Sequence, residues 1–466
     1  MAKMIIDGTE YTAYPGELLS DALRRAGFSI PMPCGGRGIC GKCLVTVNAQ
    51  KVPACEFVIE SDLSVALPRR ERIVSDLGAA EDRDAAGEPA FALDIGTTTL
   101  ALALVSRNGG KIIRAVTGVN PQRAFGADVM NRIGACRANG PAPLQTAVLE
   151  AVKELLRELD APYVDTMYVA GNTTMLHLFF GVDCSAMGAA PYTPVFLASR
   201  TVPGASLGLD GVGQIVSLPC AAAFVGADLT AGLNLVGLPP AGKYRLLVDL
   251  GTNAEIILFS EDSALCTAAA AGPCFEGANI SCGMSASEGA ICAYSSGGYT
   301  TVGGAPAAGV CGTGLVDAVA ALLENETIDE AGYLEGGSYP LAPGVTLTQE
   351  DVRQYQLAKS AVCSAIRTLL LRQSVEYDEI DALYIAGGFS AKINIENAVK
   401  TGLLPRELEE KCVAVGNSSL LGTVKFAAEQ NDLSVFLGNM QYVDLAADPV
   451  FSDLFIENML FGGDDL

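Results

Sequence analysis

The chain has 466 residues, half of them apolar, and this length favours two to four domains over one. Its formal charge of −23 repels phosphate backbones and anionic lipids, which argues against nucleic acid and membrane surfaces as partners. No apolar run reaches the roughly 18 residues that span a bilayer, and no export signal is evident. Because 14 cysteines accompany this absence, we expect a cytoplasmic protein with reduced thiols.

The first 68 residues predict a small domain of the β-grasp type. Residues 3–13 predict a hairpin around an Asp7–Gly8 turn, and residues 17–27 predict a helix with one apolar face. Further strands are expected at 44–47 and 61–68. Strands that cross over a single helix in this way are typical of a β-grasp fold.

A cysteine-rich loop lies between the expected helix and the strand after it. Cys34, Cys40 and Cys43 have the spacing C-x5-C-x2-C, and Cys55 follows. Four thiolates complete a [2Fe–2S] site, whereas structural zinc usually takes paired, closely spaced cysteines. The pattern therefore favours a cluster over zinc or buried core cysteines, and the region resembles a [2Fe–2S] ferredoxin. Two gaps depart from the plant-type spacing: five residues separate Cys34 from Cys40 where four are usual, and Cys55 follows Cys43 much sooner than the last cysteine of most ferredoxins does. Cys55 is therefore the least secure of the four expected ligands.

Residues 69–90 predict a solvated linker. They are charged, rich in alanine and glycine, and lack apolar periodicity. A linker beside a redox site would allow the first domain to swing between partners.

Two similar phosphate-binding turns are expected after the linker. The first consists of Asp94, Gly96, Thr97 and Thr98, and the second of Asp249, Gly251, Thr252 and Asn253. Such a turn offers backbone N–H groups and hydroxyls to a phosphate, while the aspartate holds Mg²⁺ or orients an attacking water. The repeat predicts two lobes around one ATP, lobe I at 91–242 and lobe II at 243–466. No P-loop motif occurs.

The two phosphate turns, with a glycine turn at 387–388, resemble the ASKHA superfamily of sugar kinases, Hsc70 and actin. Combined with the ferredoxin-like start, the chain resembles the reductive activators of corrinoid proteins. The matching segments include NPQRAFGADVMNRI (120–133), VAGNTTMLHLF (169–179), FVGADLTAG (224–232), AAAAGPCFEGANISCGM (268–284), GVCGTGLVDAVA (309–320), IAGGFSAKINIENAVKTGLLP (385–405) and GNSSLLGT (416–423). Longer members carry a domain between the cluster and the ATPase, so the short linker predicts a short form that lacks this middle domain.

The resemblance implies an α/β protein, with an α+β β-grasp ferredoxin domain at 1–68 followed by a two-lobed, actin-like ASKHA ATPase. It also implies ATP-dependent transfer of one electron from a [2Fe–2S] cluster to Co(II) in the corrinoid protein of a methyltransferase system, which restores Co(I). The cobalt couple is expected below the roughly −400 mV of a plant-type cluster. Each ~60 mV of that gap costs about 1.4 kcal/mol, and ATP-driven closure of two lobes would supply it.

The site residues expected from this hypothesis fall into three groups. The metal ligands are Cys34, Cys40, Cys43 and Cys55. The catalytic candidates are Asp94 and Asp249, either of which would orient the attacking water, and Asp228. The residues that would bind ATP and Mg²⁺ are Gly96, Thr97, Thr98, Gly251, Thr252 and Asn253, with Gly387 and Gly388 under the adenosine.

Three other functions stay open. One is an activator of a different low-potential metalloenzyme, and another is a small-molecule kinase with a regulatory ferredoxin domain. The third is a plain electron-transfer or scaffold protein whose ATPase lobe has decayed, which the intact aspartates of both phosphate turns argue against. An activator also needs an upstream electron donor, and the family's ATPase regions tend to form homodimers. The only histidine, His177, is expected to be a hydrogen-bonded core residue, and Lys359 an exposed, salt-bridging one.

Overall fold

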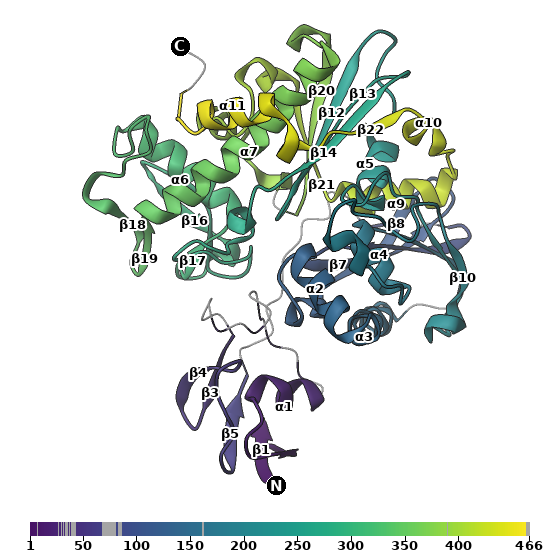
Figure 1. Cartoon of the computed structure of the whole chain (residues 1–466), viewed down its shortest axis with the longest axis vertical. Coiled ribbons are helices and arrows are strands. Elements are labelled where there is room, and N and C mark those ends of the chain that lie inside the picture. Colours follow the sequence, from purple (N-terminus) through teal and green to yellow (C-terminus); the bar gives the residue numbers. More distant parts are fainter. Residues whose placement is uncertain are drawn as a thin grey trace.

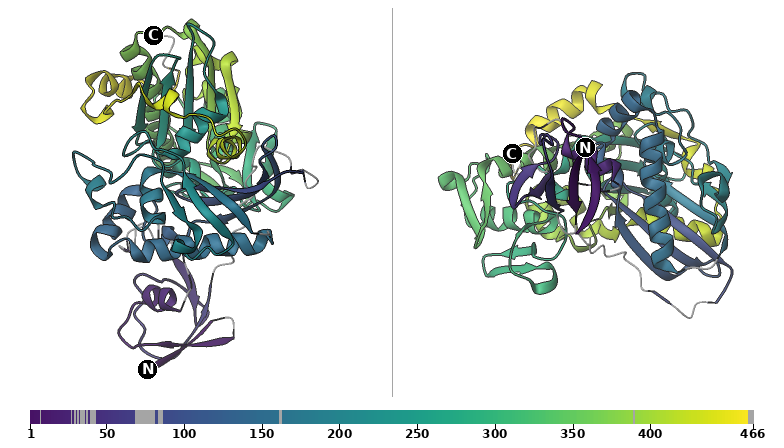
Figure 2. Two further views of the ribbon diagram at one scale, coloured as in Figure 1. Left: turned by 90° about the vertical axis from the view of Figure 1, so that its right-hand side faces the viewer. Right: turned by 90° about the horizontal axis from the view of Figure 1, so that it is seen from below.

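The computed structural model describes residues 1–462 apart from 7, 27, 29, 31, 33–35, 37, 39–42, 68–80, 83–85, 161–162 and 389. A small N-terminal domain lies at one end of two larger lobes (Figure 1). Figure 2 shows the same domain projecting from the lobes in a second view. Cys34, Cys40 and the Asp7 side of the first turn lie outside the described residues.

The N-terminal domain has the expected β-grasp fold. Its elements are β1 (Ala2–Ile6), β2 (Thr9–Ala13), α1 (Leu19–Arg25), β3 (Leu44–Val47), β4 (Gln50–Pro53) and β5 (Leu63–Ala66). The strand order is β2-β1-β5-β3-β4, with β1 parallel to β5. Side chains alternate along β1, so Met4 and Ile6 are buried while Lys3 is exposed. They pack against Leu19 and Leu23 of α1 in one apolar core.

The first lobe is built on a six-stranded sheet of order β10-β11-β9-β6-β7-β8. Its elements are β6 (Pro89–Ile95), β7 (Thr99–Ser106), β8 (Lys111–Val119), η1 (Pro121–Ala124), α2 (Val129–Asn139), α3 (Ala142–Leu159), β9 (Val164–Gly171), α4 (Thr173–Phe179), β10 (Thr201–Pro203), β11 (Val212–Ser217) and α5 (Ala227–Val236). The apolar stripe of α3 is buried at Val148, Val152, Leu155 and Leu159, as the sequence indicates, but Leu156 is only half-buried.

The second lobe repeats this plan in a sheet of order β21-β20-β12-β13-β14-β22. Its elements are β12 (Tyr244–Leu250), β13 (Ala254–Phe259), β14 (Ala264–Ala269), α7 (Gln349–Gln373), β20 (Ile380–Ala386), α8 (Ile395–Lys400), β21 (Cys412–Gly416), α9 (Ser418–Glu429), α10 (Ser434–Leu437), β22 (Met440–Tyr442) and α11 (Pro449–Glu457). In both lobes an antiparallel three-stranded meander is followed by two parallel strands. The duplication expected from the two phosphate turns is therefore present in the backbone.

A smaller group of elements extends from the second lobe. It contains β15 (Ala290–Ser295), β16 (Gly298–Thr301), β17 (Gly309–Val310), α6 (Gly312–Glu324), β18 (Ser338–Ala342) and β19 (Val345–Thr348). The long helix α7 follows β19 and begins with the expected capping box between Thr348 and Asp351.

Two helices join the lobes. Helix α9 follows the last parallel strand of the second lobe, yet it packs against β6, β7 and β9 of the first. It also packs closely on α5: a Cβ added at Gly422 would lie 1.8 Å from the Ala231 carbonyl oxygen. Because only glycine permits this approach, the two helices form a close junction between the lobes.

Lys359 does not have the exposed position expected for it. Its side chain on α7 is buried, its ammonium donates a hydrogen bond to the Leu460 carbonyl, and it lies 4.9 Å from the centre of the Phe461 ring. The chain after α11 folds back over α7 and covers this lysine, which the local sequence does not indicate.

The described end of the linker is held against the first lobe. Asp82 pairs with Lys111 at 2.8 Å, and its N–H donates to the Ile112 carbonyl on the edge strand β8. Glu88 pairs with Arg107 at 3.2 Å. Residues 81, 86, 87 and 88 are exposed, so this described end of the linker lies along the lobe surface in contact with solvent.

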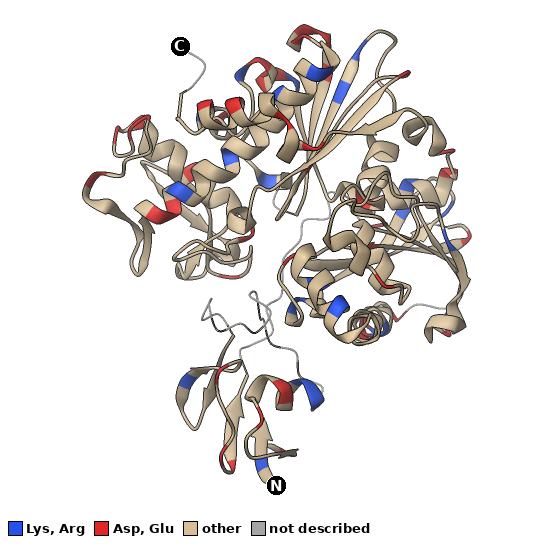
Figure 3. Cartoon of the chain, in the orientation of Figure 1, with Lys and Arg blue, Asp and Glu red and all other residues tan. Residues whose placement is uncertain are grey.

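Charged residues of both signs are spread along the ribbon of the domain and of both lobes (Figure 3). Among the described residues, no helix combines the length and apolarity that crossing a membrane requires.

Candidate functional site

The first phosphate turn connects β6 to β7. Asp94 is 8% exposed at the end of β6, and the Gly96 N–H closes the turn by donating to the Thr99 carbonyl at 3.0 Å. A Cβ at Gly96 would lie 2.7 Å from that same carbonyl oxygen, so the turn requires glycine. The turn therefore presents Thr97 and Thr98 at the edge where the parallel strands end.

The second lobe holds the Asp94 carboxylate. Asn417 Nδ2 donates to one oxygen at 2.8 Å, and Ser419 Oγ donates to the other at 2.7 Å. Both donors stand at the start of α9, where the helix dipole also favours a negative charge. Burial raises the pKa of Asp94, and these two hydrogen bonds oppose that rise. Asp94 thus ties the two lobes together.

Asp249 takes the matching position in the second lobe, at the end of β12, but its surroundings differ. Gly387 comes so close that an added Cβ would lie 3.1 Å from an Asp249 carboxylate oxygen. Among the described residues, no side chain or N–H donates a hydrogen bond to this carboxylate. Burial raises the pKa of Asp249 to about 8, with further contributions from the charges of Asp228, Asp94 and Glu276.

Glu276 connects the two phosphate turns. One carboxylate oxygen accepts a hydrogen bond from the Thr98 hydroxyl at 2.9 Å, and the other accepts one from the Thr252 hydroxyl. The two threonines belong to different lobes, so a single side chain bridges the opening where the turns meet. Glu276 ends η4 (Pro273–Glu276), and the sequence did not indicate its role because an isolated glutamate there carries no spacing signal.

Other carboxylates make this opening strongly acidic. Asp228, in the first turn of α5, has a pKa raised to about 7, first by burial and also by the charge of Asp94. Glu255 pairs in register with Asp249 across β12 and β13, and burial raises its pKa well above the usual range. An ATP polyanion here would need a cation between it and these groups, which fits the preference of Mg²⁺ for carboxylate and phosphate oxygens.

The glycine turn expected under adenosine follows β20. Gly387 has a φ of +111°, and a Cβ there would lie 2.3 Å from the Leu250 carbonyl oxygen. A Cβ at Gly388, by contrast, would meet no atom within 4 Å. Gly387 is thus fixed by packing beside Asp249, while Gly388 faces open space of the kind that a flat ring could fill.

A buried arginine supports the first phosphate turn from behind. Arg132 on α2 is fully buried, and its guanidinium donates to the carbonyls of Thr97 and, at 3.0 Å, Gly126. Burial lowers its pKa to about 9, opposed by the charges of Asp128 and Glu276. Sequence reasoning missed this residue because its partners are backbone carbonyls.

The described part of the cysteine site brings two of the four expected ligands together. The Cys43 and Cys55 sulfurs lie 3.2 Å apart, and both residues are buried. Gly36 and Gly38 of the loop have φ values of +82° and +74°, and a Cβ at Gly36 would lie 3.9 Å from the Cys55 Cβ. Cys55 therefore stands against the cysteine loop despite its unusual spacing. These thiols fit a shared metal centre.

His177 is a structural residue, as expected. It is fully buried, its Nδ1–H donates to the Thr173 carbonyl at 2.7 Å, and its Nε2 accepts the Val195 N–H at 3.0 Å. Both ring nitrogens are thus occupied, and burial lowers the pKa of the imidazole.

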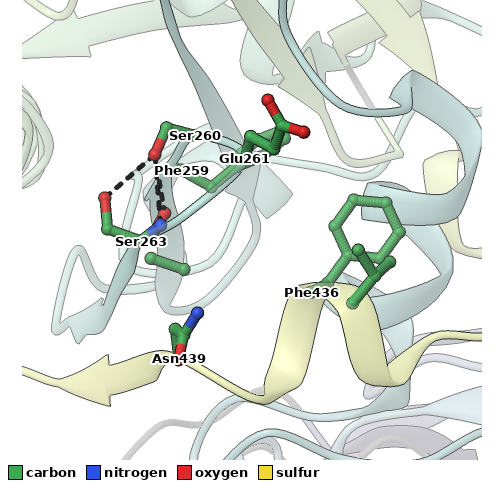
Figure 4. A pocket seen from close by; sticks show the side chains of 8 residues that line it. Phe259, Ser260, Glu261, Ser263, Phe436 and Asn439 are labelled. Atoms are coloured by element: carbon green, nitrogen blue, oxygen red, sulfur yellow. Dashed lines mark hydrogen bonds between the residues drawn. The ribbon is translucent and has the colours of Figure 1, made fainter. Parts of the chain in front are cut away.

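Two hollows lie away from these groups. The one in Figure 4, between the β13–β14 turn and α10, contains a Ser260–Ser263 hydroxyl pair at 3.0 Å and has no volume for a water molecule. A second, open groove of about 530 Å³ runs between the β7–β8 turn and α9 and includes Arg107 and Lys425. Neither contains an expected site residue.

Three family models match successive parts of the chain. Residues 4–68 match the model of the 2Fe-2S iron-sulfur cluster binding domain, residues 90–240 that of the RACo middle region, and residues 243–466 that of the C-terminal domain of RACo, the ASKHA domain.

Individual proteins also match most of the chain. The chain is 25% identical to the corrinoid activation enzyme RamQ of Eubacterium limosum over 96% of each protein. It is 26% identical to a [Co(II) methylated amine-specific corrinoid protein] reductase of Methanosarcina barkeri, over 74% of this chain and 70% of that one. The solved structure of a reductive activator for corrinoid, iron-sulfur protein matches with a TM-score of 0.72 at 28% identity, covering 99% of this chain and 98% of that one.

One expectation is overturned by these matches. The chain is not a short form without a middle domain, because residues 90–240 match the RACo middle region. The middle region folds as one of the two lobes and carries the first phosphate turn. Its D-x-G-T motif is typical of an ATPase lobe, so the sequence placed this region in the ATPase and indicated no separate middle domain.

Proposed function

We propose that this chain, whose regions are those of the reductive activators of corrinoid proteins, uses ATP to drive one electron onto the cobalt of a corrinoid protein. The electron converts Co(II) to Co(I), the nucleophilic state that methyl transfer requires. The observation that carries the proposal is the union, in one chain, of a cysteine-bearing ferredoxin domain and two lobes whose phosphate turns meet at Glu276.

The cluster would be held by Cys34, Cys40, Cys43 and Cys55. The 3.2 Å approach of the Cys43 and Cys55 sulfurs supports this set. A bound [2Fe–2S] cluster supplies the electron, at roughly −400 mV when it is of the plant type. An upstream electron donor must restore that electron after each turnover.

ATP would bind between the lobes. The hydroxyls of Thr98 and Thr252 already point to one acceptor, so both can turn to phosphate oxygens. Backbone N–H groups at Gly96, Thr97, Gly251 and Asn253 would complete the phosphate contacts, and Gly387 and Gly388 would lie under the adenosine.

Asp249 is the better candidate to hold Mg²⁺ or to orient the attacking water. Its carboxylate accepts no hydrogen bond from the described residues, whereas Asn417 and Ser419 occupy both oxygens of Asp94. A divalent cation would also offset the burial that raises the pKa of Asp249, and so favour its charged form. Asp228 would act through this cation or through water.

Closure of the lobes supplies the coupling. The Asp94 contacts and the close α5–α9 junction connect the lobes directly, so phosphate binding at both turns would shift them as units. A homodimer through the ATPase region, and domain limits at 1–68, 69–90, 91–242 and 243–466, remain proposals.

An anaerobic assay tests the proposal. Purified chain, a chemical reductant, ATP with Mg²⁺ and a Co(II) corrinoid protein are mixed, and the Co(I) absorption band is followed. A band that needs ATP supports the proposal. ATP consumption without Co(I), across several corrinoid proteins, would instead support activation of another metalloenzyme or a kinase.

A further inference from the structure

The ferredoxin domain touches the first lobe at residues 124–125. Ala124, at the end of η1, is 7% exposed because it packs into the apolar core of the ferredoxin domain, the core that also contains Cys43 and Cys55. Phe125 packs against the same core, and the Arg24 guanidinium of α1 lies 5.5 Å from the centre of its ring. This is a cation–π contact between two regions of the chain.

The start of η1 is hydrogen-bonded to the first phosphate turn. The Asn120 N–H donates to the Thr98 carbonyl at 2.9 Å, and Asn120 Nδ2 donates to the Gly96 carbonyl at 2.8 Å. Asn120 is fully buried and its Oδ1 accepts the Gln122 N–H at 3.0 Å, so the start of η1 is fixed to the turn.

Arg132 makes a second connection between the two places. Its guanidinium holds the Thr97 carbonyl in the phosphate turn and the Gly126 carbonyl next to Phe125. Gly126 lies close against α2, since an added Cβ would lie 2.4 Å from the Asn131 Cβ. The guanidinium is planar and rigid and bonds to both carbonyls, so a shift of the Thr97 carbonyl would displace the Gly126 carbonyl as well.

We propose that residues 120–132 couple the first phosphate turn to the ferredoxin domain, so that ATP binding releases this domain from Phe125. The docked arrangement occurs together with Glu276 holding the Thr98 hydroxyl, and phosphate oxygens compete for that hydroxyl. When the turn closes on phosphate, its carbonyls at Gly96, Thr97 and Thr98 shift, and Asn120 and Arg132 move with them. The domain that carries the electron is then free to face a corrinoid protein.

The contact is suited to reversible docking. Arg24 keeps a side-chain exposure of 46% and also pairs with Asp21 at 3.2 Å, so its release from Phe125 leaves no buried charge. Phe125 itself is half-buried. The inference rests on the proposed function for its purpose, but the docking itself is measured without any corrinoid protein.

The chain contains no tryptophan, so a single tryptophan introduced at position 125 would report this contact by its fluorescence. In full-length Phe125→Trp protein with its cluster, addition of ATP and Mg²⁺ should shift the emission to longer wavelength as the indole becomes exposed. The shift should saturate over the same ATP range as hydrolysis. An emission that ATP leaves unchanged while hydrolysis proceeds would overturn the inference.

Neighbouring arginines provide a matched pair of variants. In the Phe125→Trp background, Arg24→Ala should give the released emission before ATP is added. Arg25→Ala should keep the ATP response, because among the described residues Arg25 bonds within its own domain, to Glu17 at 2.7 Å and to the Thr12 carbonyl. Equal behaviour of the two variants would contradict the proposed contact.

Arg132→Lys tests the connection itself. It keeps the charge but loses the fork that joins Thr97 to Gly126. With the cluster spectrum intact, this variant should still dock yet lose the emission response at saturating ATP. A retained response would refute the role of Arg132. Cobalt reduction, followed separately in the unaltered chain, tests the proposed function, so the two can fail independently.

Discussion

The two lobes share the order of their meander and parallel strands and a D-x-G-T turn, but they use the strand-end aspartate differently. Asp94 is locked by Asn417 and Ser419, while Asp249 accepts no hydrogen bond from the described residues. The residue opposite Asp94 in register is Ala101, whereas the residue opposite Asp249 is Glu255. The comparison indicates that one copy of the motif has become a joint between lobes and the other has kept a carboxylate available for chemistry.

The strongest test of this division is Asp249→Asn. Loss of the available carboxylate should lower ATP hydrolysis by about 10²–10⁴-fold, the usual contribution of a positioned acid–base group. The visible spectrum of the cluster, in a different domain, serves as the control and should not change. Hydrolysis within about threefold of the unaltered chain would show that Asp249 is not the catalytic copy.

Asp94→Asn should act on stability and coupling instead. The two charge-assisted hydrogen bonds from α9 would weaken, which should lower the free energy of unfolding by about 2 kcal/mol. ATP-stimulated cobalt reduction should be lost while the cluster spectrum stays intact. Urea unfolding measures the first effect. Cobalt reduction at the unaltered rate would show that this joint is not needed for coupling.

Glu276→Gln tests whether the carboxylate that bridges the two phosphate turns competes with the phosphates of ATP. The amide keeps the shape but removes a negative charge that competes with phosphate for the hydroxyls of Thr98 and Thr252. Removing that charge should tighten binding of a non-hydrolysable ATP analogue about fivefold, or ~1 kcal/mol. Calorimetry measures the change, and weaker binding would mean that Glu276 instead positions the nucleotide.

A further test of the Asp249 carboxylate concerns pH. The pKa of Asp249 is about 8 in the folded protein and near 3.8 in the unfolded chain, so folding takes up a proton between these values. The nucleotide-free protein should therefore lose stability as the pH rises from 4 to 8, and no further from this group above 8. Asp249→Asn should flatten that slope, so thermal unfolding at pH 6 and pH 8.5 should differ less in the variant.

The sequence predicted the repeated part of this architecture well. A strand that ends in D-x-G-T has a local signal, and its second copy indicated the duplicated lobes that the sheets confirm. The β-grasp domain was likewise indicated by short alternating strands around one helix. The cysteine ligands stay a prediction, since two of them lie outside the described residues.

The residues that join these parts could not be predicted in the same way. Glu276, Arg132 and Asn417 acquire their roles from contacts across long stretches of chain, and their own neighbourhoods carry no motif for them. Lys359 was expected to be exposed because lysine usually is, and only the returning C-terminal segment buries it. The middle region was not recognised as a separate region because its D-x-G-T motif is the motif of an ATPase lobe.

The crossing of α9 into the first lobe sets an order of assembly during translation. The core of that lobe includes Leu420, Val424 and Phe436, which leave the ribosome long after its own strands have been made. At about 5–20 residues per second, the nascent sheet waits on the order of ten seconds or more for these side chains. The ferredoxin domain waits far less, since every member of its apolar core except Ala124 has been made by residue 68. A chain that stopped before residue 418 would lack part of the core of its first lobe, so the newly made protein has most need of chaperones in that interval.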